Sequence, residues 1–411
     1  MSAVDPRRPD GTHRVVVTGM GAVTGFGLGL APYWDGIAGG KTAIKLTTRS
    51  FEDLEITRPA ATVADYIPGD HFTDSELLMS EPFVQYARLA AREALAEAGL
   101  SGEQLTDAAI VLGCGGGGEQ SREDAAKQMF GKKRPRAHPM SVPRINHQAA
   151  VGMIAIEHQI FGPGLVIATG CAAGSHAVAQ ATMMLRHGYA GIALTGGTEA
   201  NVLYSSIRGF DAARIVASDT CRPFSAGRSG LALGEGAGVL VIETLASAQA
   251  RGAQIIAEIA GFGMSSDARD PVQPTQRGPV RAVRQALSDA QIPPDAIAYV
   301  NAHGTGTLLN DVVETNVARE VFGPHADKLM MSSTKSQIGH TLGAAGALEL
   351  IATLMGMSKG VIPPTVNFLD SDPECDIDCV PNDARDVKFS AALSQSFAFG
   401  GVNAALAVRK V

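Results

Sequence analysis

The stretch Ile167-Ala-Thr-Gly-Cys-Ala-Ala-Gly-Ser-His176 decides how the chain around it folds. The apolar run at 164–168 predicts a buried strand, and the small residues that follow predict a helix over about 172–187. Cys171 therefore falls at a strand-to-helix turn, where free N–H groups and the positive end of the helix dipole lower the pKa of a thiol. Small neighbours leave its sulfur reachable. The pattern is typical of a nucleophile, and a buried structural cysteine is the alternative.

The composition indicates a large α/β protein. The chain has 411 residues, of which 45% are hydrophobic, 18% are charged and 47 are glycine. Such a chain buries a large core, and many glycines suit tight turns between strands and helices. The net charge of −7 argues against a nucleic-acid binder, which normally carries a basic domain.

The cysteines and the N-terminus predict the compartment. Five scattered cysteines, an odd number, suit a reducing cytoplasm without a disulfide framework. Cys375 and Cys379 are close in sequence, but no second pair or nearby histidine completes a zinc site.

Residues 1–12 are polar, which predicts a flexible tail and not a signal peptide. No run of eighteen apolar residues occurs, so we expect no membrane span.

A glycine-rich stretch near the N-terminus invites a dinucleotide-binding interpretation. The apolar run at 14–19 predicts a short strand that leads into a glycine-rich turn. A Gly-x-Gly-x-x-Gly motif starting at Gly19 needs a third glycine where Thr24 stands, and no acidic residue follows a second strand at the expected distance. The sequence therefore excludes a nicotinamide site.

Further apolar segments indicate two similar halves. Strands are predicted at 109–112, 190–199 and 237–243, and an amphipathic helix at 80–100. A new strand within 253–261 begins a second α/β half. We therefore predict a tail at 1–12 and two halves at 13–255 and 256–411. Each half opens with a strand followed by glycine.

Three more stretches place reactive or glycine-rich residues at the ends of strands or the starts of helices. A lone histidine at a strand end is more often structural, but His303, Lys335 and His340 together at such junctions indicate a catalytic site. The three stretches are Tyr299-Val-Asn-Ala-His-Gly-Thr-Gly-Thr307, Ser332-Ser-Thr-Lys-Ser-Gln-Ile-Gly-His340 and Gln395-Ser-Phe-Ala-Phe-Gly-Gly-Val-Asn403.

On these motifs the chain resembles, over essentially its whole length, the elongating β-ketoacyl-[acyl carrier protein] synthases of the thiolase-like superfamily. The resemblance implies a five-layer αβαβα sandwich of two duplicated halves, usually dimeric. It implies a 3-oxoacyl-[acyl carrier protein] synthase, which joins a Cys171-bound acyl chain to malonyl carrier by decarboxylative Claisen condensation. His303 and His340 would stabilise the enolate, and Lys335 would organise His340 together with Glu349.

The resemblance also implies binding residues. The backbone N–H groups of Cys171 and Phe399 would form the oxyanion hole, and Thr305 and Thr307 would bind the 4'-phosphopantetheine arm of the acyl carrier protein. No metal or bound cofactor is expected. The acyl pocket and its gate would include Gly116, Phe397, Ala398 and Phe399. The acidic carrier would dock on the basic residues Lys132, Lys133, Arg134, Arg136 and Arg214.

The second histidine narrows the reaction within the superfamily. Initiating synthases use histidine and asparagine, and thiolases use histidine and a second cysteine. His340 therefore favours elongation of a carrier-bound chain over a thiolase-like reaction on coenzyme A. A non-catalytic, chain-length-determining partner subunit is a further alternative, but such a subunit normally lacks the cysteine. The resemblance leaves a homodimer and a heterodimer with such a subunit open.

Departures from the family pattern indicate a specialised substrate. Gly170 stands where alanine is usual, and Val402 replaces a usual threonine. Ala398 replaces a glycine of the gate and would be strained if its φ were positive. Gly116 replaces a bulky apolar residue at the floor of the acyl pocket. These changes predict a type II polyketide or aryl-polyene-like pathway, with housekeeping fatty-acid elongation as the alternative.

Overall fold

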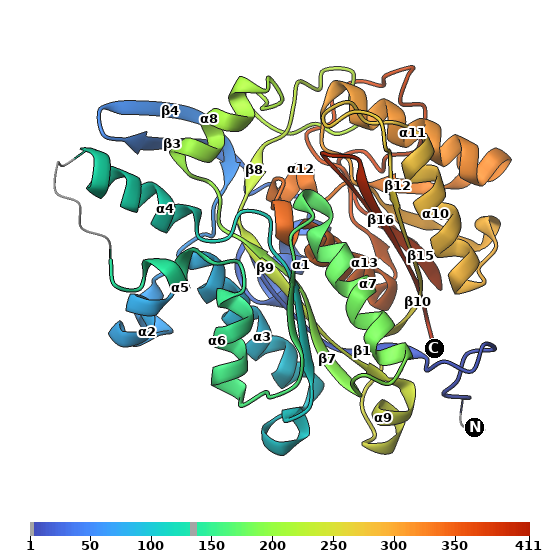
Figure 1. The fold of residues 1–411 in the computed structure, drawn as a ribbon. Coiled ribbons are helices and arrows are strands. Elements are labelled where there is room, and N and C mark those ends of the chain that lie inside the picture. Colours follow the sequence, from blue (N-terminus) through green and yellow to red (C-terminus); the bar gives the residue numbers. More distant parts are fainter. Residues whose placement is uncertain (1–3, 132–137) are drawn as a thin grey trace.

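The computed structural model describes residues 4–131 and 138–411. Its main sheet (Figure 1) consists of two halves. The two halves have the same strand order. The first half runs from β6 (Gly164–Ile167) through β5 (Ala109–Gly113), β7 (Ile192–Glu199) and β9 (Gly236–Thr244) to β1 (Val15–Thr24). The second half runs from β12 (Met330–Ser332) through β11 (Tyr299–Asn301), β15 (Ala391–Ala398) and β16 (Val402–Arg409) to β10 (Ala257–Ser266).

Strand directions repeat as well as strand order. In each half the second strand along the chain is parallel to the third and the fourth, and the fifth is antiparallel to the fourth and the first. The halves meet where β1 pairs with β10 at Val16–Glu258 and Val17–Ala257. This repetition confirms the predicted duplicated α/β fold. The boundary between residues 255 and 256 stays a prediction.

The helices form three layers around the two halves of the sheet (Figure 1). In the centre, α7 (Ala173–Arg186) packs on β5 and β7, and α13 (Ala345–Lys359) packs on β9 and β15. The outer face of the first half is covered by α3 (Pro82–Ala98) and α6 (Ala149–His158). The outer face of the second half is covered by α10 (Arg277–Ala290), beside which lies α11 (Leu308–Phe322).

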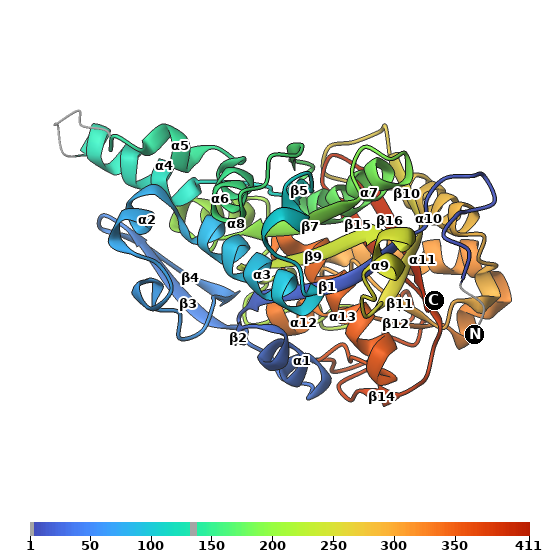
Figure 2. The ribbon, with the colours of Figure 1, turned by 90° about the horizontal axis from the view of Figure 1, so that it is seen from below.

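Smaller elements lie around these layers. The hairpin of β3 (Lys45–Phe51) and β4 (Leu54–Ala61) and the helices α4 (Glu119–Ala126) and α5 (Ser141–Ile145) project at the end of the molecule opposite both termini (Figure 2). The others are α1 (Leu30–Ala38), α2 (Asp74–Met79), α8 (Tyr204–Ala212), α9 (Leu245–Ala250), α12 (Lys335–Ile338), β2 (Gly27–Leu28), β8 (Leu233–Gly234), β13 (Val361–Ile362) and β14 (Arg385–Asp386).

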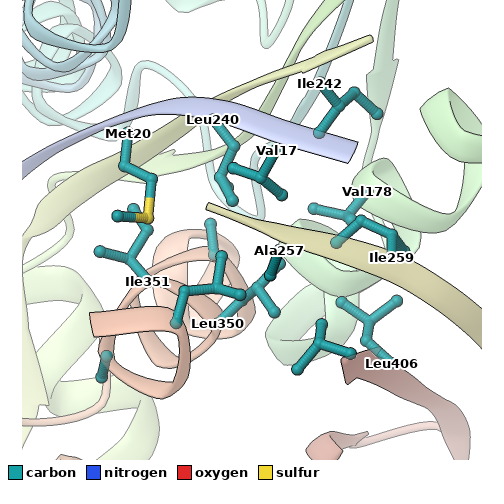
Figure 3. Packing of buried hydrophobic residues seen from close by; sticks show 14 of the residues in the cluster. Val17, Met20, Val178, Leu240, Ile242, Ala257, Ile259, Leu350, Ile351 and Leu406 are labelled. Carbon is teal, nitrogen blue, oxygen red and sulfur yellow. The ribbon is translucent and has the colours of Figure 1, made fainter. Parts of the chain in front are cut away.

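One core joins both halves to the central helices (Figure 3). Leu240 comes from the first half of the sheet, Leu406 from the second, and Val178 and Ile351 from α7 and α13. Each of these side chains is fully buried, and burial of one such aliphatic side chain stabilises the fold by about 1.5–3 kcal/mol. The central helices are therefore held firmly from both sides.

The predicted glycine-rich turn comes later than expected: β1 continues to Thr24, so Gly19 and Gly21 lie inside the strand, and the turn falls at 25–26 before β2. A Cβ on Gly19 would lie 2.1 Å from the carbonyl oxygen of Ala94, and one on Gly21 would lie 2.0 Å from that of Ala90. Both carbonyls belong to α3. These glycines therefore serve the close approach of α3 to β1.

The run at 164–168 forms the predicted strand, but the predicted burial is wrong. As β6, it pairs among residues 4–131 and 138–411 only with β5 and forms the free edge of the first half of the sheet. Leu165 is 42% exposed, and large apolar side chains nearby in the sequence, Ile156 and Phe161, are 68% and 76% exposed. An apolar sheet edge of this kind is a ready surface for another chain.

Candidate active site

Cys171 lies between β6 and α7, as predicted. It occupies a single 3₁₀ turn, Gly170–Ala172, directly before α7 begins at Ala173. Gly170 has a φ of 56°, in the left-handed region that glycine enters without strain. The glycine at this position therefore suits the turn that presents the sulfur.

The predicted lowering of the Cys171 pKa is wrong. Burial, with a smaller contribution from the negative charge of Glu199, raises the pKa of the Cys171 thiol to about 11. The Lys335 ammonium acts in the opposite direction but is outweighed. The residue is only 9% exposed, so loss of hydration disfavours the thiolate more than the surrounding positive groups favour it.

We therefore expect alkylation of Cys171 by iodoacetamide to speed up about tenfold per pH unit between pH 7 and 9, because the thiolate is the reactive form. The rate should not level off below about pH 10. Peptide-resolved mass spectrometry measures it, with Cys171→Ala as the blank. A plateau below pH 8 would show that the pKa is lowered after all.

The two predicted histidines come together at the carboxyl ends of the second-half strands. The centroids of the His303 and His340 rings are 5.4 Å apart, and the rings are nearly perpendicular, at 84°. The Leu342 N–H donates to Nδ1 of His340 over 3.3 Å, which places the imidazole proton on Nε2. That Nε2 is buried and has no hydrogen-bond partner among the described residues. It is thus an N–H donor free to bind a ligand.

His303 is oriented by Lys335. Its Nδ1 lies 3.3 Å from the Lys335 Nζ, which carries only donors, so the His303 proton also resides on Nε2. Burial and the Lys335 charge lower the pKa of both histidines well below 6.5, and the His340 charge adds to this at His303. Both rings are therefore neutral at physiological pH.

Lys335 and Glu349 form a buried ion pair, each side chain being 1% exposed. The same Nζ also donates to the backbone carbonyl of His303 over 2.6 Å. Burial raises the pKa of Glu349, and the Lys335 charge opposes this. Lys335 thus bonds Glu349 and His303, and it acts on His340, which it was expected to organise, through its charge.

Sequence reasoning missed the acidic residue that fixes the loop around His303. Glu314 on α11 is 1% exposed and accepts the backbone N–H groups of His303 at 2.6 Å and Gly304 at 2.7 Å. Asp311, one turn earlier, accepts the Phe224 N–H at 2.8 Å. A signal was available, because two acids spaced by three on a helix that follows the histidine loop face the same way.

Cys171, His303 and His340 line one cavity of about 260 Å³. Its surface is more apolar than polar, and Phe399, 47% exposed, stands among its lining residues. The hydroxyls of Thr305 and Thr307 are 2.9 Å apart and also line it. The other predicted residues that line the cavity are Arg214, Phe397 and Ala398.

Two expectations for the acyl pocket change. Ala398 ends β15 and is not among the residues with positive φ, so it is not strained. Gly116 does not line the cavity. A Cβ on Gly116 would lie 2.1 Å from Nδ2 of Asn201, so the space expected to hold an acyl chain is filled by a neighbouring side chain.

The docking residues are only partly placed. Arg214 is exposed and lines the cavity. The basic cluster of Lys132, Lys133, Arg134 and Arg136 lies outside the described residues.

Two features of the described chain bear on metals and membranes. Within residues 4–131 and 138–411, no group of three or more His, Cys, Asp and Glu side chains could hold a metal ion. The same search finds no helix both long and apolar enough to cross a membrane. All five cysteines are free and buried.

Family comparisons agree with this geometry. Residues 12–248 match the family described as Beta-ketoacyl synthase, N-terminal domain, and residues 256–369 match Beta-ketoacyl synthase, C-terminal domain.

Individual proteins match over nearly the whole length. The chain is 41% identical to Nodulation protein E of Rhizobium sp. (strain N33), over 97% of this chain and 100% of that one. It is 39% identical to 3-oxoacyl-[acyl-carrier-protein] synthase 2 of Staphylococcus aureus (strain COL), over 97% of this chain and 98% of that one. The solved ishigamide ketosynthase/chain length factor superposes with a TM-score of 0.91 at 35% identity, covering 97% and 100% of the two chains.

Proposed function

From the premise that this chain belongs to the β-ketoacyl synthase family and is a decarboxylating condensing enzyme, we propose the role of each site residue and the pathway it serves. One observation carries the assignment of roles. A cysteine and two neutral imidazoles line one cavity, and a buried lysine orients one of the imidazoles. This set matches the needs of an acyl transfer followed by formation of an enolate.

Cys171 accepts the acyl chain. Its sulfur attacks the thioester carbonyl of the acyl carrier protein, and the carbon–sulfur bond to the carrier breaks. The proton of the Cys171 thiol passes to the departing carrier sulfur, and a Cys171 thioester remains. The backbone N–H groups of Cys171 and Phe399 hold the oxyanion during this step. Support comes from the position of both residues on the cavity.

His303 and His340 promote decarboxylation of malonyl carrier. The bond between the malonyl carboxylate and its methylene carbon breaks, carbon dioxide leaves, and the electron pair becomes an enolate. Its oxygen accepts the Nε2–H groups of both histidines. Support comes from the bonds at both Nδ1 atoms, which leave the protons on Nε2. Neutral donors in a buried site stabilise such a charge strongly.

The enolate carbon then attacks the Cys171 thioester. A carbon–carbon bond forms, the carbon–sulfur bond breaks, and 3-oxoacyl carrier is released. The departing thiolate of Cys171 takes a proton from water, which its raised pKa favours.

The carrier protein is the partner and brings the only prosthetic group we expect. Thr305 and Thr307 hydrogen-bond its 4'-phosphopantetheine arm, and Arg214 binds its acidic surface near the cavity. The protein itself needs no bound cofactor. The five free thiols favour a reducing cytoplasm, which cell fractionation would test.

The pathway we propose is of the type II polyketide or aryl-polyene kind. It is supported by the likeness to the ishigamide ketosynthase/chain length factor. It is also supported by Ala398, which stands where the family's gate has glycine and lines the cavity between Phe397 and Phe399. Housekeeping fatty-acid elongation is the second candidate, favoured by the identity to 3-oxoacyl-[acyl-carrier-protein] synthase 2.

The free edge at β6 supports a dimer. Pairing of β6 with another chain would satisfy its open backbone groups and cover Ile156, Phe161 and Leu165. The other chain is a second copy or a chain-length subunit, and the latter is supported by the same ishigamide likeness.

A donor panel tests pathway and assembly together. Purified protein, its mass in solution first measured by light scattering, is mixed with saturated and polyunsaturated acyl carriers, and malonyl carrier is added afterwards. We expect a dimer and a Cys171 adduct that forms at least about tenfold faster from unsaturated donors and then gives 3-oxoacyl carrier. Equal or faster use of saturated donors would favour fatty-acid elongation. A monomer without any adduct would require co-expression with a partner subunit.

A further inference from the structure

A buried carboxylate joins two loops of the site. Glu199, the last residue of β7, is completely buried. Its Oε2 accepts the N–H groups of Gly115 at 2.8 Å and Gly343 at 3.0 Å, and its Oε1 accepts that of Gly116 at 3.1 Å. Gly115 and Gly116 belong to the first half of the fold and Gly343 to the second. One side chain therefore ties the glycine loop after β5 to the turn after His340.

That turn is strained and orients His340. Leu342 has a φ of 46°, which costs energy for a residue with a branched side chain. Its N–H makes the 3.3 Å bond to Nδ1 of His340, and the next N–H, that of Gly343, makes the bond to Glu199. The Glu199 bond therefore holds the backbone in the conformation that directs the His340 ring.

The turn also packs closely against the glycine loop after β5 and against the Glu199 carboxylate. A Cβ on Gly343 would lie 2.5 Å from the nitrogen of Gly115 and 2.8 Å from the Glu199 carboxylate. Burial raises the pKa of Glu199 to about 7, against which the bonds from backbone N–H groups act. The loops and the carboxylate thus form one tightly packed unit.

We propose that Glu199 is a positioning residue for decarboxylation: through Gly343 and Leu342 it fixes the His340 ring so that Nε2–H points at the enolate oxygen. Glu199 itself touches no substrate. The inference rests on the proposed role of His340, and it predicts that loss of Glu199 impairs decarboxylation and spares acylation of Cys171.

The test uses Glu199→Gln in two backgrounds. The amide keeps the shape but replaces one acceptor by a donor, so at least one of the three N–H groups loses its partner and the others lose charge assistance. In the Cys171→Gln background we expect kcat for malonyl-carrier decarboxylation to fall at least about tenfold, with KM changed less than about twofold. With Cys171 present, the rate of acylation should not fall by more than about threefold, and loss of the Glu199 charge, which raises the pKa of Cys171, favours a faster rate.

A matched control is Glu81→Gln. Glu81 is 2% exposed, accepts the backbone N–H of Ser121 at 2.7 Å, and also has a pKa raised by burial. It does not contact the His340 turn, so both rates should match the parent. If the Glu199→Gln variant does not fold, Glu199→Asp is tested in its place. The shorter side chain keeps the negative charge but moves the carboxylate away from the three N–H groups.

Three outcomes would overturn the inference. The first is an equal fall in acylation and decarboxylation, which indicates general disruption. The second is a decarboxylation rate within about threefold of the parent. The third is a failure of the Cys171→Gln parent to decarboxylate malonyl carrier at all, which would overturn the proposed function and the inference with it.

Discussion

Replacing Cys171 with alanine abolishes acyl transfer, lowering the rate at least about 10³-fold, because no other nucleophile can form the thioester. Replacing it with glutamine separates the two half-reactions. Lys335 bonds Nδ1 of His303 and the Leu342 N–H bonds Nδ1 of His340, so both imidazoles keep their proton on Nε2. Neither bond depends on the sulfur of Cys171. Cys171→Gln should therefore still release carbon dioxide from malonyl carrier.

Intact-mass spectrometry measures the acyl adduct, and release of labelled carbon dioxide measures decarboxylation. Cys114→Ala is the matched control, because Cys114 is also a buried free cysteine with a pKa raised by burial, but it does not line the cavity. It should acylate normally. Acylation that survives Cys171→Ala and disappears with Cys114→Ala would reverse the assignment of the nucleophile.

The reactive residues could be predicted from sequence because each follows a local pattern. Cys171 comes between a strand and a helix, and His303 lies in a loop directly after a strand. Their meeting in one site could not be predicted from these local patterns, because β6 and β11 lie in different halves of the sheet, and only the resemblance to the family predicted it. The duplicated fold was predicted from the resemblance to the family, because the sequence itself indicates only that both halves open with a strand followed by glycine.

What sequence could not give depends on contacts between distant segments. Gly19 and Gly21 look like a turn because the helix that requires them lies some seventy residues later. The dipole at Cys171 is local, but the burial that outweighs it comes from the assembled fold. Glu199 is bonded by backbone groups from two other segments, and no spacing in the sequence relates them.

Breaking the buried ion pair of Lys335 and Glu349 is expected to lower both stability and the rate of decarboxylation. Lys335→Met leaves the Glu349 carboxylate buried without its cation, and breaking such a pair costs about 3–5 kcal/mol of stability. It also removes the donor to Nδ1 of His303, so the proton of that imidazole is no longer confined to Nε2. We expect a clear drop in the denaturant midpoint and a fall in decarboxylation of about 10²-fold.

The double variant Lys335→Met with Glu349→Leu separates these two consequences. Replacing a buried ion pair by apolar residues of similar size is often neutral or stabilising, so the denaturant midpoint should return toward that of the parent. Decarboxylation should stay low, because His303 has still lost the group that fixes its tautomer. If activity recovered together with stability, Lys335 would serve only to neutralise Glu349, and the orientation of His303 would have to come from its backbone bond to Glu314.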